Sequence, residues 1–263
     1  MRPDDSDIQR QSVYPEAVEV IKEREYPSLK GTIYLDHAGT TVPSVSSISS
    51  FAERMTTNLY GNPHSASSAA QLSSRQADDA RVRVLKLLNA DPDYFDVVFV
   101  ANATAGIKLV AEGMRDYFRD GFGYRYLVDS HTSSVGVREF ARTGASALED
   151  DGAVYKFISG LDKGSEPILF EYPAQSNMTG RRYSLDWCKR LRKSGSGKSA
   201  NRFSLLDAAS YVATSPLDLS DLESAPDFTV LSFYKIFGFP DLGALIVRKE
   251  AGFIFSKRSA EYG

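Results

Sequence analysis

The sequence predicts an α/β protein in which a mainly parallel sheet is covered by helices on both faces. Short apolar runs alternate along the chain with longer segments of helical spacing, which is the pattern of strands joined by crossover helices. The chain has 263 residues, of which 42% are hydrophobic, enough for one large domain with a sizeable core. Sheets of this kind bind ligands beyond the carboxyl ends of their strands.

The first part of the chain is expected to be an N-terminal arm followed by a long helix. Residues 1–30 are polar and charged, with a short helix around Tyr14–Glu25. Ile33–Leu35 is an extended segment that leads into a turn-rich stretch. A helix is expected between Ser65 and Leu88, because apolar residues recur there at helical spacing after a proline. Residues 31–263 are taken as one domain.

Further along the chain, strands and helices are expected to alternate. The strands are expected at Val97–Val100, Tyr126–Val128, Val154–Phe157, Ile168–Phe170, Phe203–Leu206, Phe228–Leu231 and Ala244–Val247. The helices are expected at Thr104–Phe118, Ser133–Arg142 and Leu185–Lys193. Polar residues follow several of these strands, so candidate site residues are sought there.

Charge and composition argue against several functional classes. The formal net charge is −3, and nucleic-acid binding depends on clustered basic charge, so no nucleic-acid partner is expected. No apolar stretch approaches the roughly 20 residues that span a bilayer, and residues 1–7 contain no apolar signal segment. We therefore expect a cytoplasmic protein that does not bind a membrane.

Cys188 is the only cysteine in the sequence. An intrachain disulfide and a zinc site built from cysteine pairs are therefore excluded, and no metal site is expected. Because Cys188 lies in the middle of an expected helix, without a glycine-rich loop around it, we expect a thiol that packs in the core.

One glycine-lysine-serine sequence resembles the end of a nucleotide-binding P-loop. Gly197-Lys198-Ser199 closes the polar segment Ser194–Ser199, but a P-loop also needs a glycine five positions earlier, where Arg192 stands. The segment also follows a helix, whereas a P-loop follows a strand. It is therefore expected to be a solvated loop.

Two polar residues at the ends of expected strands point to a cofactor. Asp207 ends the run Phe203–Leu206, and Lys235 follows the run Phe228–Leu231. Pyridoxal phosphate enzymes need an amine that holds the cofactor aldehyde as a Schiff base, and a carboxylate that pairs with the protonated pyridine nitrogen. A surface lysine beside a turn and an aspartate helix cap are the structural alternatives. Taken singly, each residue favours its structural alternative, so the choice between a cofactor site and these alternatives depends on the other segments of the chain.

Further polar segments fall where such a site needs them. Asn102–Gly106 joins a strand to a helix, so its amides and the Thr104 hydroxyl can hold a phosphate, although an ordinary threonine cap is the alternative. His131 follows the next strand, where an imidazole can lie flat on a pyridine ring; a lone histidine is more often structural. Asn177 can hydrogen-bond a ring hydroxyl or form a simple turn, and Ser232 can add a hydroxyl to the phosphate site.

Together these segments resemble the class V aminotransferase group of pyridoxal phosphate enzymes, within it the cysteine desulfurase branch, and in particular the N-terminal part of molybdenum cofactor sulfurases. The segments that carry the resemblance are Tyr34–Thr41, Tyr60–Ser65, Phe170–Asn177, Leu206–Ala209 and Ser232–Pro240. The Asp-His-Ala-Gly-Thr-Thr and Ser-Phe-Tyr-Lys-Ile-Phe-Gly sequences among them are specific to the sulfurases. The resemblance implies the large domain of a fold type I pyridoxal phosphate-dependent transferase.

The resemblance also implies a set of cofactor-binding residues. Lys235 would bind pyridoxal 5′-phosphate and act as the acid and base of the reaction. Asp207 would pair with the pyridinium nitrogen, and His131 would stack on the ring. Asn177 matches the position that contacts the ring hydroxyl. The phosphate-binding positions are matched by Ala103, Thr104 and Ser232.

The reaction that the resemblance implies removes sulfur from L-cysteine and leaves alanine and a persulfide on an enzyme cysteine. The sulfurases then pass this sulfur to the molybdenum cofactor. A homodimer is expected, since the family pairs subunits across the active site.

Some features depart from the family pattern. Ser210 stands where bacterial desulfurases have a glutamine near the ring hydroxyl, so that contact is expected to be lost. The family sequence continues beyond the position of Gly263 into a small domain, with the substrate-carboxylate arginine and the persulfide cysteine, and a domain for the molybdenum cofactor. We therefore expect a truncated chain without full turnover. Two other interpretations stay open: another class V reaction, kynureninase-like or aminotransferase-like, and an inactive fragment.

Overall fold

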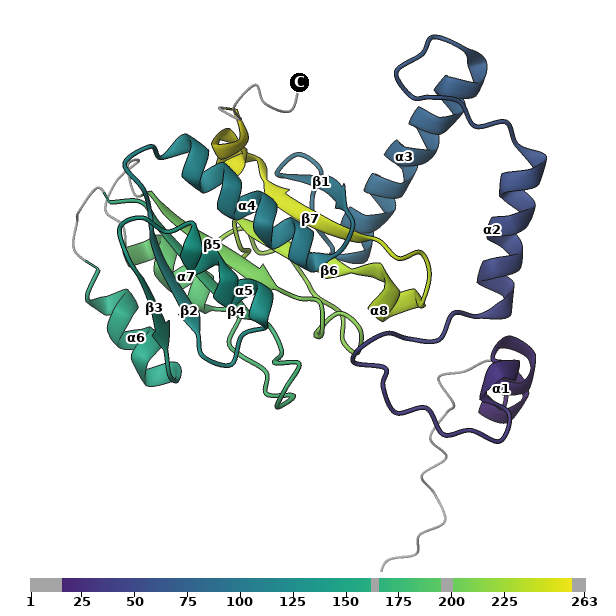
Figure 1. The fold of residues 1–263 in the computed structure, drawn as a ribbon, viewed down its shortest axis with the longest axis horizontal. Helices are drawn as coiled ribbons and strands as arrows, with labels where there is room; N and C mark the ends of the chain where they lie inside the picture. Colours follow the sequence, from purple (N-terminus) through teal and green to yellow (C-terminus); the bar gives the residue numbers. More distant parts are fainter. Residues whose placement is uncertain (1–15, 162–165, 195–200, 257–263) are drawn as a thin grey trace, which may run out of the picture.

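The structure is a computed structural model that describes residues 16–161, 166–194 and 201–256. Within these ranges the chain forms one seven-stranded sheet in the order β1-β7-β6-β5-β4-β2-β3 (Figure 1). The strands are β1 Phe95–Val100, β2 Gly123–Leu127, β3 Ala145–Leu148, β4 Ile168–Pro173, β5 Arg202–Asp207, β6 Phe228–Ser232 and β7 Gly243–Arg248. Most of the loop expected at Ser194–Ser199 lies outside the described residues.

Six of these strands run in the same direction, and β7 runs against its two neighbours. Parallel pairs join β3, β2, β4, β5 and β6 in series, whereas β7 pairs antiparallel with both β6 and β1. Since β1 and β6 both oppose β7, they point the same way. The carboxyl ends of six strands therefore meet at one edge of the sheet, where β7 also begins. The expected mainly parallel sheet is confirmed.

Helices cover both faces of this sheet (Figure 1). The helices of the described ranges are α1 Val18–Glu25, α2 Val45–Thr57, α3 Ser68–Leu87, α4 Ala103–Tyr117, α5 Thr132–Gly136, α6 Asp151–Ser159, α7 Trp187–Ser194 and α8 Phe233–Phe237, with 3₁₀ segments at Pro27–Leu29, Val137–Glu139 and Lys249–Phe255. Helices α1 and α2 lie apart from the sheet and bury no residue (Figure 1). One core cluster includes α4 and the other includes α3, α6 and α7. Alternate strand residues supply the two clusters: in β4, Leu169 belongs to the first and Phe170 to the second.

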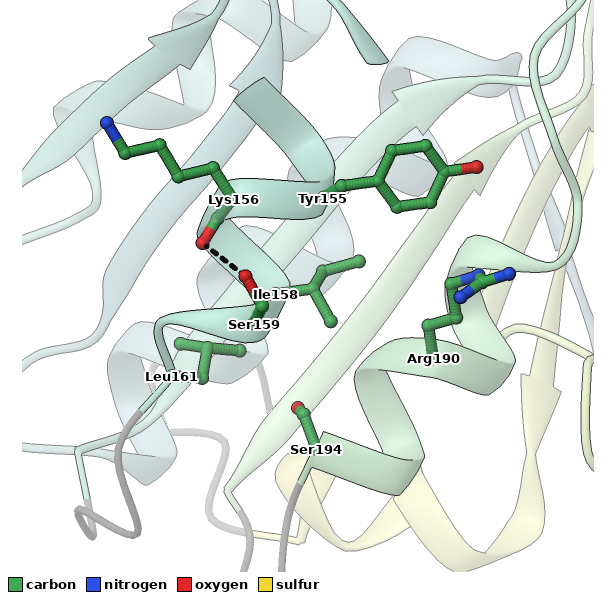
Figure 2. A pocket seen from close by; sticks show the side chains of 7 residues that line it. All are labelled: Tyr155, Lys156, Ile158, Ser159, Leu161, Arg190 and Ser194. Atoms are coloured by element: carbon green, nitrogen blue, oxygen red, sulfur yellow. Dashed lines mark hydrogen bonds between the residues drawn. The ribbon is translucent and has the colours of Figure 1, made fainter. Parts of the chain in front are cut away.

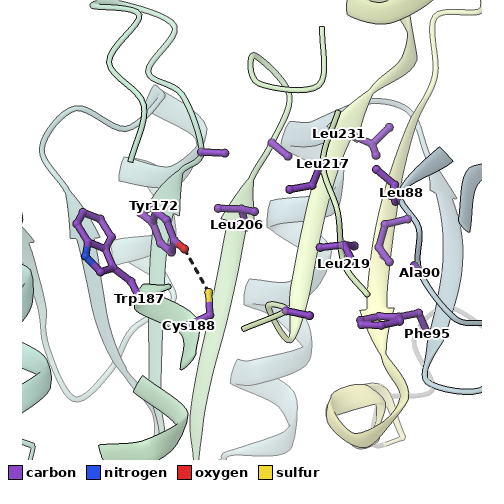
Figure 3. Close-up of a cluster of buried hydrophobic side chains, with 14 of the residues drawn as sticks. Leu88, Ala90, Phe95, Tyr172, Trp187, Cys188, Leu206, Leu217, Leu219 and Leu231 are labelled. Atoms are coloured by element: carbon purple, nitrogen blue, oxygen red, sulfur yellow. Dashed lines mark hydrogen bonds between the residues drawn. The ribbon is translucent and has the colours of Figure 1, made fainter. Parts of the chain in front are cut away.

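The cluster under α7 contains large buried aromatic side chains. Trp187 is fully buried, and its ring centroid lies 5.0 Å from that of Tyr172 in β4. Figure 3 shows this cluster, with the Tyr172 hydroxyl 3.3 Å from the sulfur of Cys188. Burial of aromatic surface of this size is a large favourable term in packing a helix on a sheet. Cys188 is a core thiol, as expected.

The strand expected at Val154–Phe157 is wrong, because these residues lie in helix α6. Asp150 caps the helix, since its carboxylate accepts a hydrogen bond from the amide of Ala153 at 2.8 Å. Val154 and Ile158 are buried on one side of α6, which is helical spacing. The four residues Val-Tyr-Lys-Phe are too short a run to distinguish a strand from a helix by their pattern. The strand of this region is the preceding edge strand β3, which is largely exposed.

The other expected elements are present, with shifted ends. The helix expected at Ser133–Arg142 is shorter, because α5 ends at Gly136 and a 3₁₀ segment follows. The sequence pattern gives no expectation for α2, which Ser44 caps by accepting a hydrogen bond from the Ser47 amide at 3.2 Å. Residues 16–30 hold α1 and a 3₁₀ segment without a buried residue, and a domain boundary at residue 30 stays a prediction.

A segment near the N-terminus is attached to helix α8. The amide of Thr41 donates to the carbonyl oxygen of Tyr234 at 3.1 Å, and the Thr40 hydroxyl donates to the same oxygen at 3.4 Å. Gly238 follows α8 with a φ of +73°, and a Cβ at this glycine would lie 2.6 Å from the carbonyl oxygen of Thr41. The contact between these two distant parts of the chain therefore requires glycine at position 238.

Replacing Gly238 with alanine should destabilise the protein more than the same change at Gly31. The φ values are +73° and +70°, so each substitution costs about 1–2 kcal/mol for the left-handed backbone. A Cβ at Gly31 meets no atom within 4 Å, whereas one at Gly238 meets the backbone of Thr41. In urea unfolding we expect G238A to lose about 1–3 kcal/mol more than G31A. Equal losses would show that the N-terminal segment does not pack on α8.

Candidate cofactor-binding site

The candidate residues all lie where parallel strands end. Ala103 and Thr104 follow β1, His131 follows β2, Asn177 follows β4, Asp207 ends β5, Ser232 ends β6 and Lys235 follows it. Because these strand ends share one edge, residues far apart in the sequence become neighbours: Ala103 and Ser232 form a hydrogen bond across 129 positions. The sheet topology assembles this set of side chains.

Lys235 lies on the short helix α8, half-buried, directly after β6. It lines a cavity of about 160 Å³ together with His37, Asn177 and Ser210. Its ammonium is close enough to Asp207 for the two charges to interact. An amine that lines a small cavity beside a carboxylate can react with a ligand held there.

Asp207 is a buried carboxylate, with 8% of its surface exposed. One oxygen accepts a hydrogen bond from the Ala209 amide at 3.0 Å, the one hydrogen bond that this carboxylate makes within the described ranges. Burial raises the pKa of Asp207, and the Ala209 amide, Lys235 and His131 oppose that rise. The second oxygen is therefore available to a cationic N–H donor.

His131 is fixed at the start of α5. Its Nδ1 accepts a hydrogen bond from the Ser133 amide at 3.2 Å and lies 2.7 Å from the Ser133 hydroxyl. Because Nδ1 is an acceptor there, the hydrogen of the neutral imidazole is on Nε2. The half-buried ring is near enough to Asp207 for the two groups to interact electrostatically. The imidazole and the carboxylate therefore belong to the same site.

Ser232 and the N-terminus of α4 meet at the same edge. Ser232 Oγ accepts a hydrogen bond from the Ala103 amide at 3.1 Å, and no acceptor takes the Ser232 hydroxyl hydrogen among the residues that the structure describes. The cap of α4 is Asn102, which accepts from the Ala105 amide at 2.9 Å, so the alternative of a threonine cap at Thr104 is wrong. Thr104 is exposed beside the helix N-terminus, where an anion is favoured.

Asn177 is exposed, in a loop that Asp129 holds in place. The Asp129 carboxylate accepts hydrogen bonds from the hydroxyls of Thr179 at 2.8 Å and Tyr183 at 2.7 Å. Partial burial opposes ionisation, but these hydrogen bonds lower the pKa of Asp129. One turn after β2 thus positions both Asn177 and His131. The sequence pattern predicts only His131 as a site residue in this turn; the acidic residue directly after the strand is the signal that points to Asp129.

A second buried carboxyl, Glu171, was also missed. It lies within β4, fully buried, and contacts the hydroxyls of Tyr124 and Ser134. Burial and the nearby charge of Asp207 raise the pKa of Glu171 to about 8. The signal in the sequence is a single charged residue inside the otherwise apolar run Ile168–Pro173.

Cys188 does not belong to this group of residues. Only 1% of it is exposed, and burial raises the pKa of its thiol to about 11. A protonated thiol in the core does not act as a nucleophile.

A larger hollow, of about 540 Å³, lies between α6 and α7 (Figure 2). The guanidinium of Arg190 lies 5.3 Å from the ring centroid of Tyr155 there, and the lining contains none of the candidate residues. Within the described ranges, no group of three or more His, Cys, Asp or Glu residues could hold a metal ion. No helix in the same ranges is both long and apolar enough to cross a membrane.

The residues at this edge fit pyridoxal 5′-phosphate. The open oxygen of the buried Asp207 suits a protonated ring nitrogen, and Lys235 supplies an amine for the aldehyde. The unused hydroxyl hydrogen of Ser232 and the exposed Thr104 at the N-terminus of α4 suit a phosphate.

Known proteins of similar sequence support this assignment. The aminotransferase class-V family profile matches residues 33–257. The chain is 61% identical over 247 residues to the molybdenum cofactor sulfurase of Aspergillus fumigatus, covering 93% of this chain and 29% of that protein. It is 58% identical over 249 residues to the molybdenum cofactor sulfurase of Emericella nidulans, covering 94% of this chain and 30% of that protein. The chain thus spans less than a third of the length of these relatives.

Solved structures agree on the fold. The apo cysteine desulfurase from Thermococcus onnurineus NA1 matches with a TM-score of 0.73 and 19% identity, over 92% of this chain and 59% of that chain. A NifS-like protein from Rickettsia africae ESF-5 matches with a TM-score of 0.69 and 19% identity, over 87% of this chain and 64% of that chain. The chain therefore belongs to the aminotransferase class-V family, with the fold of the large domain of fold type I transferases and pyridoxal 5′-phosphate as its cofactor.

Proposed function

We propose that this chain forms the cofactor-binding part of an enzyme that removes sulfur from L-cysteine and passes it to the molybdenum cofactor. The observation that carries the proposal is that Asp207 and Lys235, at the ends of the neighbouring strands β5 and β6, are near enough for their charges to interact, while Lys235 lines a cavity. The 61% identity to a molybdenum cofactor sulfurase supports the substrate and the sulfur acceptor.

When bound, pyridoxal phosphate withdraws electrons from the substrate's Cα, which eases proton removal and cleavage of the Cβ–S bond. Asp207 would keep the ring nitrogen protonated by accepting its hydrogen bond, which is strong because the carboxylate is buried. His131 would support one face of the ring, and Asn177 would donate to or accept from the ring hydroxyl. Ala103, Thr104 and Ser232 would surround the phosphate.

Lys235 would act twice. Its Nζ would hold the cofactor and, when free, would remove the proton from Cα of L-cysteine and return it in forming alanine. The position of Lys235 on α8, which the Thr40–Thr41 segment holds from outside, keeps the amine at the cavity. Orientation of this kind accounts for much of the benefit of a bound base.

The sulfur balance needs an acceptor thiol. L-Cysteine and an acceptor thiol give alanine and a persulfide, so the step requires no added oxidant or reductant. Cys188 is excluded as the acceptor, because it is buried and protonated. The acceptor thiol must therefore come from outside residues 1–263.

The homodimer remains part of this proposal. Helix α2 exposes Ile48, Phe51 and Met55 at 39%, 47% and 50% of their surface, an apolar stripe that pairing with a second copy would cover.

Replacing Lys235 with alanine should abolish covalent attachment of the cofactor. The parent protein with added pyridoxal phosphate should show the visible absorbance band of the lysine-bound cofactor. K235A should not show this band, whereas K249A, which changes an exposed lysine beyond β7, should keep it. Borohydride reduction and peptide mapping should place the label on Lys235.

Three outcomes would decide against parts of the proposal. Equal colour in K235A and the parent would remove Lys235 from the site. A folded parent without any band would favour an inactive fragment. A band that L-cysteine does not change would favour a different class V reaction.

Replacing Cys188 with alanine should leave the cofactor chemistry intact. We expect the absorbance band and its response to L-cysteine to stay within about twofold of the parent, while the free energy of unfolding falls by about 1 kcal/mol because a buried contact with Tyr172 is lost. Spectral titration and urea unfolding measure the two effects. A normal band that no longer responds to L-cysteine would instead make this thiol a participant.

A further inference from the structure

Glu171 lies in the sheet on the same face as Asp207. In the register of β4 and β5, Glu171 is opposite Leu205, and Asp207 is two residues further along β5. In the register of β2 and β4, Glu171 is opposite Tyr126. Paired residues, and residues two apart on a strand, point to the same face. Both carboxyls therefore face the layer that contains α4 and α5.

The hydrogen bonds of Glu171 tie β4 to the helix that follows His131. The Ser134 hydroxyl donates to Oε1 of Glu171 at 2.7 Å. The Tyr124 hydroxyl oxygen lies 3.2 Å from Oε2 of Glu171 and 2.8 Å from the carbonyl oxygen of Ser134. Glu171 thus contacts both β2 and α5, and His131 is the N-cap residue of α5.

Counting hydrogens shows which group must donate. A tyrosine hydroxyl has a single hydrogen, and the shorter of its two contacts is with the Ser134 carbonyl oxygen, which can only accept. The contact of Tyr124 with Oε2 of Glu171 is then a hydrogen bond only if Oε2 carries a proton and donates it. A neutral Glu171 satisfies both contacts, and an ionised one leaves two oxygens facing each other without a hydrogen.

Among the described residues, the groups that act most strongly on Glu171 carry no positive charge. Those that act on it most strongly are the carboxyl of Asp207 from β5 and the hydroxyls of Ser134, Tyr124 and Ser130. The buried Ser130 hydroxyl makes no hydrogen bond of ordinary geometry within the described ranges. By contrast, Lys235 and His131 both interact electrostatically with Asp207 and oppose the rise of its pKa. A negative charge shared between the two carboxyls is therefore more stable on Asp207.

We propose that Glu171 is a positioning residue that stays protonated while Asp207 is ionised, so that the two buried carboxyls carry one negative charge and that charge faces the cofactor ring. The part that concerns the cofactor rests on the function proposed above. The protonation of Glu171 is a property of the protein without cofactor and can be tested separately. Its pKa of about 8, raised by burial and by Asp207, agrees with the hydrogen-bond count.

The first test compares the pH dependence of folding in the parent and in E171Q without cofactor. The pKa of Glu171 is raised from 4.5 to about 8 by folding, so between these values the folded state holds a proton that the unfolded state releases. Raising the pH therefore favours unfolding. The folding equilibrium constant of the parent relative to E171Q should fall about tenfold per pH unit between pH 5 and about 8.

Glutamine is the matched replacement because it reproduces the neutral acid. Its oxygen can accept from Ser134, and its amide can donate to Tyr124. E53Q, which changes an exposed glutamate on α2, should show no such pH-dependent difference from the parent. A constant ratio between the parent and E171Q across this pH range would overturn the proposal.

The second test removes the charge of Asp207. Here the pH dependence of the folding equilibrium constant is compared between D207N and the double variant D207N/E171Q. The steep fall with pH should end at a lower pH than in the first test, because the negative charge of Asp207 no longer raises the pKa of Glu171. A merely structural role of Glu171 would leave the end of that region unchanged. If E171Q folds poorly, the curves of D207N and the parent still test the proposal, because the steep region should end at a lower pH in D207N than in the parent.

The third test uses pyridoxal phosphate as the probe at pH 7. We expect E171Q to bind it within about threefold of the parent and D207N to bind it at least about tenfold more weakly, since only D207N loses the charge. Equal weakening in both variants would overturn the assignment of the charge to Asp207. If the parent does not bind the cofactor, the proposed function fails, whereas the folding curves still decide the protonation of Glu171.

Discussion

The buried carboxylate of Asp207 is the constraint on which the rest of the site depends. A charge at the end of a central strand loses most of its hydration, and the hydrogen bond from the Ala209 amide does not replace that loss. Lys235, after the adjoining strand β6, and His131, after β2, interact electrostatically with the same carboxylate. A ligand with a cationic ring nitrogen would complete this arrangement, which agrees with the cofactor class of the family.

The antiparallel strand β7 fixes where the lysine can lie. The chain leaves β6, forms one short helix and returns directly into β7, and the Phe233 amide donates to the Leu242 carbonyl oxygen at 2.8 Å. A Cβ on Gly243 would lie 2.8 Å from the backbone of Asn102, so the return also packs against the start of α4. With the Thr40–Thr41 segment on the outside of α8, the lysine is held between two strands and the N-terminal segment.

The fold class and the candidate residues could be predicted because they depend on strong local patterns. Apolar runs mark β5, β6 and β7, and polar residues mark the ends of the strands. Helix α6 and strand β3 could not be assigned, because Val154–Phe157 fits both periods and an exposed edge strand has little apolar pattern. Asp129 and Glu171 were missed for another reason: their partners, such as Tyr183 and Ser134, are brought together only by the tertiary structure.

The two carboxyls under the site differ in function because their surroundings differ. Asp207 lies at a strand end near cations, while Glu171 lies within a strand among hydroxyls. Ionising both would place two like charges in a medium that screens them poorly, so the pair titrates as a unit. In the proposed site, a cationic ring nitrogen bound at Asp207 would stabilise the charge there and, through it, the proton on Glu171. By thermodynamic linkage, a protonated Glu171 would in turn favour the ionised Asp207 that the proposed cofactor contact needs.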